Sequence, residues 1–345
     1  MGTALLEVKN LAVHFQIPGT AGETTGIAGG EPTGVIKAVD GVSFQVFPGE
    51  TFGLVGESGC GKSVTALSLL KLLPTPPAVL AGGEVIYRPE KKQPGKDLWQ
   101  LPHGDLIKLR GREISLIFQE PMTSLNPVMK IGRQIGEALR IHSPEKALPA
   151  KELRRQVLEM LARVGIHQPE RAYEAYPHEL SGGMRQRAMI AMALICRPKL
   201  VIADEPTTAL DVTIQAQILE LLKELQVSYN LSLLLITHNL GIIAETAHRV
   251  AVMYMGRIVE LAPVKELFHN PLHPYTLGLL ASIPRLDREE ELRAIPGMIP
   301  DPLRLPAGCH FAPRCPRVME VCHKEYPVSR EAAPGHTVAC WLQDK

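Results

Sequence analysis

The chain has 345 residues, of which 45% are hydrophobic and 21% are charged, so it can form one large folded domain with a smaller appended module. Its 37 basic and 36 acidic residues nearly cancel, which argues against nucleic acid as the main partner. Its apolar runs are too short to span a bilayer, and no basic segment followed by an apolar one lies near the N-terminus. We therefore expect a cytoplasmic protein without a transmembrane segment or a signal peptide.

Strand-type and helix-type patterns alternate along most of the chain. Two strand-type segments, residues 5–15 and 35–46, flank residues 18–33, whose Gly, Thr and Pro content predicts a flexible insertion. The later segments are predicted strands at 51–55, 83–88, 113–118, 200–203 and 232–236, and predicted helices at 63–73, within 131–166 and around 214–225. This alternation predicts an α/β fold with a parallel sheet that is covered on both faces and binds ligands at the carboxyl ends of its strands.

The character of the sequence changes at about Pro271. Prolines recur throughout the remaining residues, and four of the six cysteines lie beyond residue 308. Such a stretch predicts little regular structure. We therefore predict two parts, residues 1–270 and a small, irregular, Cys- and Pro-rich C-terminal module at 271–345.

The segment from Gly56 to Ser63 reads GESGCGKS and fits the phosphate-binding pattern G-x-x-x-x-G-K-[ST] between a predicted strand and a predicted helix. Its glycines allow successive backbone amides to point at phosphates, while Lys62 adds a positive charge and Ser63 can bind magnesium. The sequence therefore predicts that the chain binds ATP with Mg²⁺. The residues predicted to form this site are Gly56, Ser58, Gly59, Cys60, Gly61, Lys62, Ser63 and Val64.

Two further segments suit ATP chemistry. The predicted strand at 200–203 is followed by Asp204 and Glu205, so the first carboxylate can hold hydrated magnesium and the second can polarise an attacking water. Residues 180–187 read LSGGMRQR, in which a serine and two glycines open a helix whose N-terminal amides can hold another phosphate. Taken alone, this second segment would favour an ordinary helix cap.

The order of the motifs resembles that of the nucleotide-binding subunit of an ABC transporter. The six motifs are the phosphate loop, Gln119 after a strand, the LSGGM segment, Asp204 with Glu205, the segment 209–211, and His238. The resemblance implies a P-loop ABC-type fold, in which a parallel-sheet core carries an antiparallel β subdomain and a helical subdomain, here at about residues 125–195. It also implies that two such domains sandwich two ATP molecules head to tail.

Matching positions imply residue roles. The implied catalytic residues are Glu205 on the attacking water, His238 on the γ-phosphate, Lys62 on the β- and γ-phosphates, and Gln119. The implied magnesium ligands are Ser63, Gln119 and Asp204, and the implied nucleotide contacts beyond the loop are Ser181, Gly182, Gly183 and Asp211. Phe15 is the aromatic residue expected to stack on adenine, with a core position as the alternative. His238 is followed by Asn239, where the family more often has Asp.

Longer segments narrow the resemblance to dipeptide and oligopeptide importers. These segments are residues 118–127, 176–180, 204–213 and 273–276, and residues 296–309 are similar to the D-type subunit. The resemblance implies an ATP-hydrolysing subunit that powers peptide import from a peripheral position at the cytoplasmic face of the plasma (inner) membrane. The implied partners are a second ATPase subunit, which makes a heterodimer, two transmembrane permeases and an extracytoplasmic substrate-binding protein.

Cys309, Cys315, Cys322 and Cys340 have five, six and seventeen residues between them, which fits neither paired zinc knuckles nor the compact ferredoxin spacing. Four thiolates suit either a tetrahedral zinc ion or an iron-sulfur cluster. Members of the peptide-importer branch resemble this chain in a four-cysteine tail that holds a 4Fe-4S cluster. We therefore expect that cluster, with Zn²⁺ as the alternative and unligated thiols as the third reading.

Other functions remain as alternatives. A soluble ABC-type ATPase that acts on ribosomes or DNA is opposed by the single ATPase domain, the lack of a long heptad segment and the balanced charge. An importer of the same family for nickel, glutathione or oligosaccharides stays open, because other subunits select the substrate. A redox-sensing role of the tail would be secondary to the complete set of ATPase motifs.

Overall fold

A computed structural model describes residues 2–17, 34–90, 94–142, 148–208, 210–283 and 294–344. The predicted insertion at 18–33 lies outside these ranges. The described strands are β1 (Leu6–Ile17), β2 (Gly34–Val46), β3 (Thr51–Val55), β4 (Ala78–Tyr87), β5 (Lys96–Asp97), β6 (Ile114–Ile117), β7 (Leu200–Asp204), β8 (Ser232–Thr237), β9 (Arg249–Tyr254), β10 (Arg257–Pro263), β11 (Arg330–Ala333) and β12 (His336–Val338).

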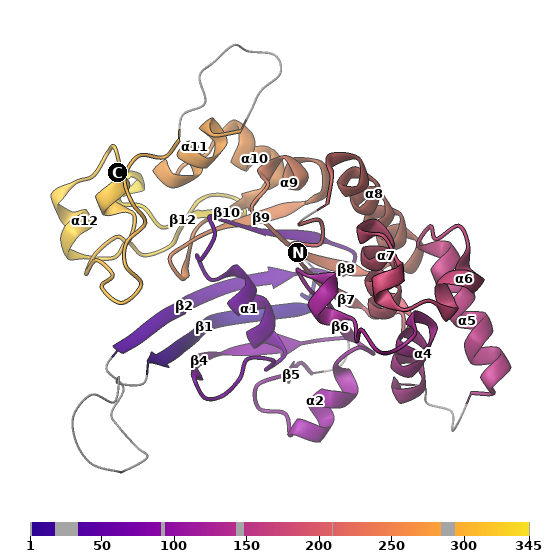
Figure 1. Cartoon of the computed structure of the whole chain (residues 1–345). Helices are drawn as coiled ribbons and strands as arrows, with labels where there is room; N and C mark the ends of the chain where they lie inside the picture. The colour runs from indigo at the N-terminus through magenta and orange to yellow at the C-terminus, as the bar shows by residue number, and fades with distance from the viewer. Residues whose placement is uncertain are drawn as a thin grey trace, which may run out of the picture.

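The helices connect these strands, with α4 to α7 at one side of the molecule and α12 at the other (Figure 1). The α-helices are α1 (Lys62–Leu69), α2 (His103–Leu109), α3 (Pro121–Ser124), α4 (Ile131–His142), α5 (Ala150–Arg163), α6 (Pro169–Glu174), α7 (Gly182–Leu194), α8 (Val212–Tyr229), α9 (Leu240–Thr246), α10 (Val264–His269), α11 (Pro274–Ala281) and α12 (Glu320–Lys324). Short 3-10 helices are η1 (Pro177–Glu179), η2 (Ala312–Arg314) and η3 (Trp341–Gln343). Among these helices, none combines the length and the apolar character needed to cross a membrane.

The main sheet has the strand order β11-β12-β10-β9-β3-β8-β7-β6. Its strands β9, β3, β8, β7 and β6 run parallel, and β10, β12 and β11 continue the sheet antiparallel. A second, antiparallel sheet has the order β2-β1-β4-β5. The predicted α/β fold with a parallel core and an antiparallel β subdomain is therefore confirmed.

Alternating side chains of the parallel strands serve two separate hydrophobic cores. In β7, Leu200 and Ile202 belong to the core beneath the second sheet and α1, whereas Val201 and Ala203 belong to the core beneath the helices. This alternation follows from the two-residue period of a strand. Both faces of the parallel sheet are thus buried, as the near-continuous apolar sequence of these strands predicts.

The helices α4 to α7 lie at one side of the molecule, and α12 of the C-terminal tail lies at the opposite side (Figure 1). Buried residues of α4, α5 and α7, among them Ile135, Val157 and Met189, pack into the core on the helical face of the main sheet. These helices correspond to the helical subdomain expected from the sequence. They place the start of α7 at an edge remote from the tail.

The tail after Pro271 carries more regular structure than its prolines predict. Pro274 begins α11 as its first residue, where a missing N–H costs nothing, rather than breaking a helix. The strand β12 pairs with β10 through Glu260↔Val338 and Leu261↔Thr337, so the tail extends the main sheet. The expected irregular module is in part a β-hairpin attached to the nucleotide-binding core.

Glu260 of β10 is fully buried and joins two parts of the tail. Its carboxylate accepts hydrogen bonds from the backbone N–H groups of Leu272 and His273, at 2.8 and 2.9 Å. Nε2 of His336 in β12 lies 2.8 Å from the same carboxylate, and the two side chains are 0% and 1% exposed. A buried carboxylate is tolerated only with partners of this kind.

We predict that His336→Ala lowers the free energy of unfolding by roughly 3–5 kcal/mol, because it leaves the buried Glu260 carboxylate without its side-chain partner. Urea denaturation of the full chain measures this change. Arg330→Ala is the matched control, since its ion pair with Asp344 is largely exposed on the Arg side and should change the value by less than about 1 kcal/mol. Equal losses in both variants would contradict the assigned role of the buried pair.

Candidate nucleotide-binding site

The phosphate loop connects the fully buried strand β3 to the N-terminus of α1. Gly56, Gly59 and Gly61 all have positive φ angles, of 156°, 80° and 105°. A Cβ atom on Gly56 would lie 2.2 Å from the carbonyl oxygen of Met253, and one on Gly61 would lie 2.2 Å from that of Ala38. Only glycine fits at these two positions, because backbone approaches the loop from both sides.

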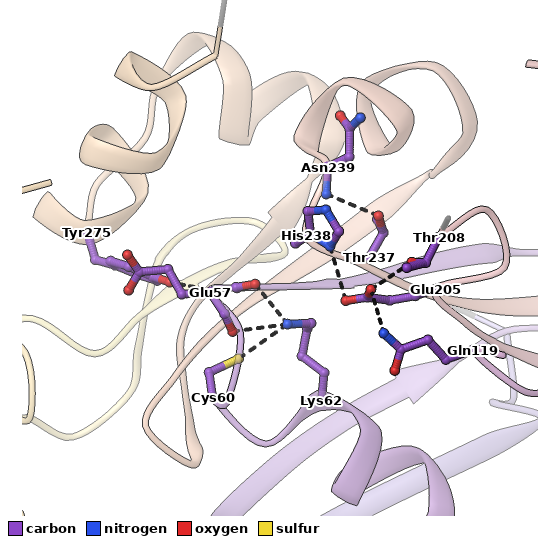
Figure 2. Close-up of polar contacts among 11 residues, drawn as sticks. Glu57, Cys60, Lys62, Gln119, Glu205, Thr208, Thr237, His238, Asn239 and Tyr275 are labelled. Carbon is purple, nitrogen blue, oxygen red and sulfur yellow. Dashed lines mark hydrogen bonds and ion pairs between the residues drawn. The ribbon is translucent and has the colours of Figure 1, made fainter. Parts of the chain in front are cut away.

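Lys62 is nearly buried, and its ammonium group stays inside the loop. Nζ donates to the carbonyl oxygens of Gly56 and Glu57, at 2.8 and 3.0 Å, and lies 3.8 Å from Sγ of Cys60 (Figure 2). Ser58 and Gly59 are exposed at the mouth of the loop. The loop therefore encloses the lysine charge, and Ser58 and Gly59 lie at its exposed face.

Cys60 is buried in the phosphate loop. The side chain is 3% exposed. Burial raises the pKa of the thiol, and the nearby Lys62 ammonium only partly opposes this rise. A buried, protonated thiol reacts slowly, so the structure argues against Cys60 as a reactive group.

Asp204 at the end of β7 fits a magnesium ligand. Its side chain is 7% exposed, and its Oδ1 is buried without a hydrogen-bond partner among the described residues. Burial raises the pKa of this carboxyl, the Glu205 charge adds to the rise, and the hydrogen bond with Ser63 opposes it. An unpaired buried oxygen beside the Ser63 hydroxyl is the donor set that Mg²⁺ prefers, so these residues fit the cation.

Three residues from separate segments meet at Glu205 (Figure 2). Oε2 of Glu205 accepts hydrogen bonds from Nε2 of Gln119 at 3.2 Å and from Oγ1 of Thr208 at 2.9 Å. Nδ1 of His238 lies 3.1 Å from Oε1, so an ionised Glu205 selects the tautomer with a proton on Nδ1. The contact uses the amide nitrogen of Gln119 and leaves its amide oxygen for a metal.

Glu205 is held as an ionised group. Burial disfavours its charge, but the hydrogen bonds from His238 and Thr208 outweigh burial and lower the pKa of the carboxyl. Its backbone is also constrained, with a φ of 45° that non-glycine residues seldom adopt. A fixed, ionised carboxylate at the end of β7 can accept hydrogen bonds from water at neutral pH.

The LSGGM segment lies on a different surface from the phosphate loop. Ser181 caps α7, and its Oγ accepts from the backbone N–H of Met184 at 3.3 Å. Ser181, Gly183 and Met184 line a cavity of about 660 Å³ together with residues of α6 and α8, and none of its lining residues comes from the phosphate loop. The two phosphate-binding motifs of one described chain therefore do not share a cavity.

The comparisons with known proteins agree with this geometry. Residues 39–208 match the family described as ABC transporter, and residues 259–322 match the family described as oligopeptide/dipeptide transporter, C-terminal region. The dipeptide transport ATP-binding protein DppD of Bacillus subtilis is 50% identical over 99% of this chain and 95% of the relative. The oligopeptide transport ATP-binding protein AppD of the same organism is 51% identical over 99% and 98%. The chain belongs to the ATP-binding subunits of peptide ABC transporters.

A solved structure supports the fold of this ATP-binding subunit. The dimeric structure of a bacterial ABC transporter cassette superposes with a TM-score of 0.60 at 26% identity, and the match covers 75% of this chain and 98% of that one. The near-complete coverage of the cassette shows that the nucleotide-binding fold is whole in this subunit. The relatives, which are transport proteins, favour transport over the ribosome- or DNA-directed alternative.

Asp211 and Asn239, which the sequence already singled out, each cap a helix of the ATP-binding subunit. Asp211 caps α8, with its side chain accepting from the N–H of Ile214 at 2.9 Å. Asn239 caps α9 and accepts from the N–H groups of Gly241 and Ile242. The amide oxygen of Asn239 thus supplies the cap that Asp would supply, and the neighbouring His238 keeps its place. Ala209 of the 209–211 motif lies outside the described residues.

The positions of Phe15 and Val64 do not test their predicted contacts with the nucleotide. Phe15 lies in β1, paired with Ile36 and Ala78, and its half-buried ring packs against the core beneath the second sheet. Val64 is half-buried in α1 and packs against the same core. Stacking of Phe15 on adenine therefore remains a prediction.

The four tail cysteines of this subunit line one small cavity of about 10 Å³, together with His273 and Trp341. Burial raises the pKa of Cys309 to about 11, and the other three cysteines add to this rise, as expected for neighbouring thiols. Within the described ranges, no three or more His, Cys, Asp or Glu side chains are arranged as a metal-ligand group. The structure brings the predicted cysteines together but does not by itself identify a metal.

Several contact residues were not predicted from the sequence. Thr208 and Gln186 support the site, the first by its bond to Glu205 and the second by donating to the carbonyl of Pro206 at 2.5 Å. Thr208 lies within the motif that starts at Asp204, so its position could have been found. Tyr275 and Arg314 contact Glu57 from the tail. Tyr275 lies in the noted segment 273–276, but that segment does not predict the contact, and Arg314 has no local signal.

We predict that Gly61→Ala weakens the binding of Mg·ADP at least about tenfold, because the added Cβ would displace either the loop or the backbone at Ala38. Isothermal titration calorimetry on the full chain measures the Kd. Gly104→Ala is the matched control, because a Cβ there meets nothing within 4 Å. Wild-type affinity in the Gly61 variant would show that the loop tolerates the crowding.

Proposed function

We propose that this subunit hydrolyses ATP at a site shared with a second ATPase subunit and thereby powers the import of dipeptides or oligopeptides through a membrane transporter. The observation that carries the proposal is the meeting of Gln119, Glu205 and His238 at the carboxyl ends of β6, β7 and β8. These ends adjoin the phosphate loop, because β8 also pairs with β3. The match of residues 259–322 to the peptide-transporter C-terminal family supports the substrate class.

In this proposal the loop binds the phosphates, and the residues at the strand ends bind magnesium and the attacking water. Backbone amides of the loop and the Lys62 ammonium bind the phosphates, and Lys62 exchanges its carbonyl partners for phosphate oxygens. Ser63, Asp204 and Gln119 would hold magnesium, which would neutralise charge on the phosphates. Glu205 orients and polarises the attacking water, and His238 contacts the γ-phosphate.

The separation of the LSGGM segment from the phosphate loop supports a paired site. The cavity beside Ser181 and Gly183 contains no loop residue, so this surface is available to the nucleotide of another subunit. We propose that Ser181, Gly182 and Gly183 complete the partner's ATP site in a head-to-tail heterodimer. ATP would then close the pair, and hydrolysis would reopen it.

We predict that Glu205→Gln retains ATP binding but lowers turnover at least about 100-fold, because an amide cannot act as the base toward water. The assay is phosphate release by the assembled transporter, with nucleotide binding measured separately. Glu224→Gln on the exposed face of α8 is the control and should hydrolyse ATP at the wild-type rate. Full activity of the Glu205 variant would refute the assigned base.

The proposed partners are two permease subunits, a second ATPase subunit and an extracytoplasmic substrate-binding protein. The proposed location is the cytoplasmic face of the plasma membrane. The division of the chain at about residue 270, into a nucleotide-binding domain and a peptide-importer tail, belongs to the same proposal. We favour peptides over nickel, glutathione or oligosaccharides as the transported substrate, because relatives at about 50% identity are named as peptide-transport proteins.

We predict that the tagged chain, expressed at its native level and purified from gently solubilised membranes, carries two permeases and a second ATPase with it. Mass spectrometry identifies these proteins. If the substrate-binding protein is also recovered, the ligand that it binds identifies the transported substrate. Ribosomal or DNA-associated partners without permeases would overturn the transport function while leaving the ATPase site intact.

We also propose that Cys309, Cys315, Cys322 and Cys340 bind a metal centre. Their convergence on one cavity supports four thiolate ligands. The family resemblance favours a 4Fe-4S cluster, and Zn²⁺ is the alternative, because both take four thiolate ligands. Binding of either metal would displace the thiol protons.

We predict that anaerobically purified protein contains iron and sulfide in the amounts of one four-iron cluster, or else one zinc ion, and that Cys315→Ser loses this metal. Elemental analysis of both proteins measures the content. Cys196→Ser, which changes a half-buried cysteine of the helical subdomain, is the control and should keep it. Finding neither iron nor zinc in the wild-type protein would exclude both metals.

A further inference from the structure

We propose that the C-terminal tail positions the phosphate loop by holding one loop residue, Glu57, through Arg314 and Tyr275. Arg314 and Tyr275 are then positioning residues for nucleotide binding, although neither belongs to an ATPase motif. Three groups of Glu57 take part: its carboxylate, its backbone N–H and its carbonyl oxygen. Each has a separate partner in the structure.

The carboxylate of Glu57 forms a two-point ion pair with the tail. Arg314 donates from its two terminal nitrogens to Oε2 and Oε1 of Glu57, at 2.7 and 3.0 Å. The Arg314 side chain is 4% exposed, and that of Glu57 is 25% exposed. The guanidinium is also fixed by the carbonyl oxygen of Pro296 at 3.3 Å and by the hydroxyl of Tyr254 at 3.4 Å. A bidentate, mostly buried pair of this kind fixes both distance and orientation.

The backbone of Glu57 is held by a second part of the tail. Its N–H donates to the hydroxyl oxygen of Tyr275 in α11 at 2.9 Å (Figure 2). Tyr275 is fully buried, with ring centroids 4.6 Å from Tyr254 and 5.4 Å from Phe311. The tyrosine cannot move freely, so its hydroxyl is a fixed acceptor for the start of the loop.

The carbonyl oxygen of Glu57 contacts the phosphate-binding lysine. Nζ of Lys62 donates to it at 3.0 Å, so the residue that the tail fixes also sets the resting position of the lysine charge. When Lys62 turns to a phosphate, Glu57 keeps its two contacts to the tail. The loop therefore stays ordered before and after the nucleotide binds, which lowers the cost of binding.

The negative charge of Glu57 gives a second reason for its ion pair with Arg314. The pattern G-x-x-x-x-G-K-[ST] requires no acidic residue at position 57, and a carboxylate near bound phosphates repels them. Arg314 compensates this charge from the buried side of the loop, and the hydrogen bond to Glu57 raises the pKa of Arg314, so it stays charged. Without Arg314, Glu57 would be misplaced and uncompensated.

The test is the Kd of Mg·ADP for the full chain and its variants, measured by isothermal titration calorimetry. Tyr275→Phe removes only the hydroxyl and keeps the ring packing, and it should weaken binding about threefold. Arg314→Gln should weaken it at least about tenfold. Glu57→Gln added to Arg314→Gln should restore part of this loss, because the uncompensated carboxylate is then absent. A purely structural role of Arg314 gives no such rescue.

Arg330→Gln is the matched control, because it removes the Arg330–Asp344 ion pair elsewhere in the tail and should leave the Kd unchanged. In the assembled transporter, Tyr275→Phe should raise the KM for ATP and change kcat by less than about twofold. Wild-type affinity for Mg·ADP in Tyr275→Phe overturns the proposal, and this variant decides the matter even if Arg314→Gln fails to fold. A double variant with no recovery overturns the charge compensation.

Discussion

The structure depends on the close approach of two backbone carbonyls to the phosphate loop. Met253 at the end of β9 and Ala38 in β2 leave no space for a side chain at Gly56 and Gly61. Since β9 belongs to the main sheet and β2 to the second sheet, the loop takes its shape only when both sheets are in place. The turn at Gly256 joins them, because its N–H donates to Cys60 and its carbonyl accepts from Asp40.

Strand order explains why distant motifs meet beside this loop. The neighbours β3, β8, β7 and β6 are parallel, so their carboxyl ends lie along one edge of the sheet. The loop follows β3, His238 follows β8, Asp204 ends β7, and Gln119 follows β6. Hydrogen bonds lower the pKa of Glu205, whereas burial raises the pKa of Asp204, whose Oδ1 has no hydrogen-bond partner among the described residues. Two adjacent carboxylates thereby acquire different chemistry.

Features encoded locally could be predicted, and features made by long-range contacts could not. The phosphate loop, Asp204, Glu205 and His238 stand in short motifs, and the parallel strands in apolar runs. The partners of Glu57, in contrast, are 218 and 257 positions away along the chain, and nothing in the pattern around them marks the contact. The prolines of the tail predict irregular structure, but β12 is a strand because it pairs with the distant β10. Burial of Cys60 likewise comes from neighbours outside its motif.

The burial of Glu260 limits how a chain of this kind can be shortened. Its carboxylate is fully enclosed, and all three of the partners described above come from residues beyond position 270. A chain cut at that point would lose these three partners together with the cover that the tail gives the carboxylate, and the edge of β10 that pairs with β12 would be left without its partner strand. The tail and the acidic residue that receives it are therefore interdependent, so a minimal nucleotide-binding fragment has to replace the contacts at Glu260 and at the edge of β10.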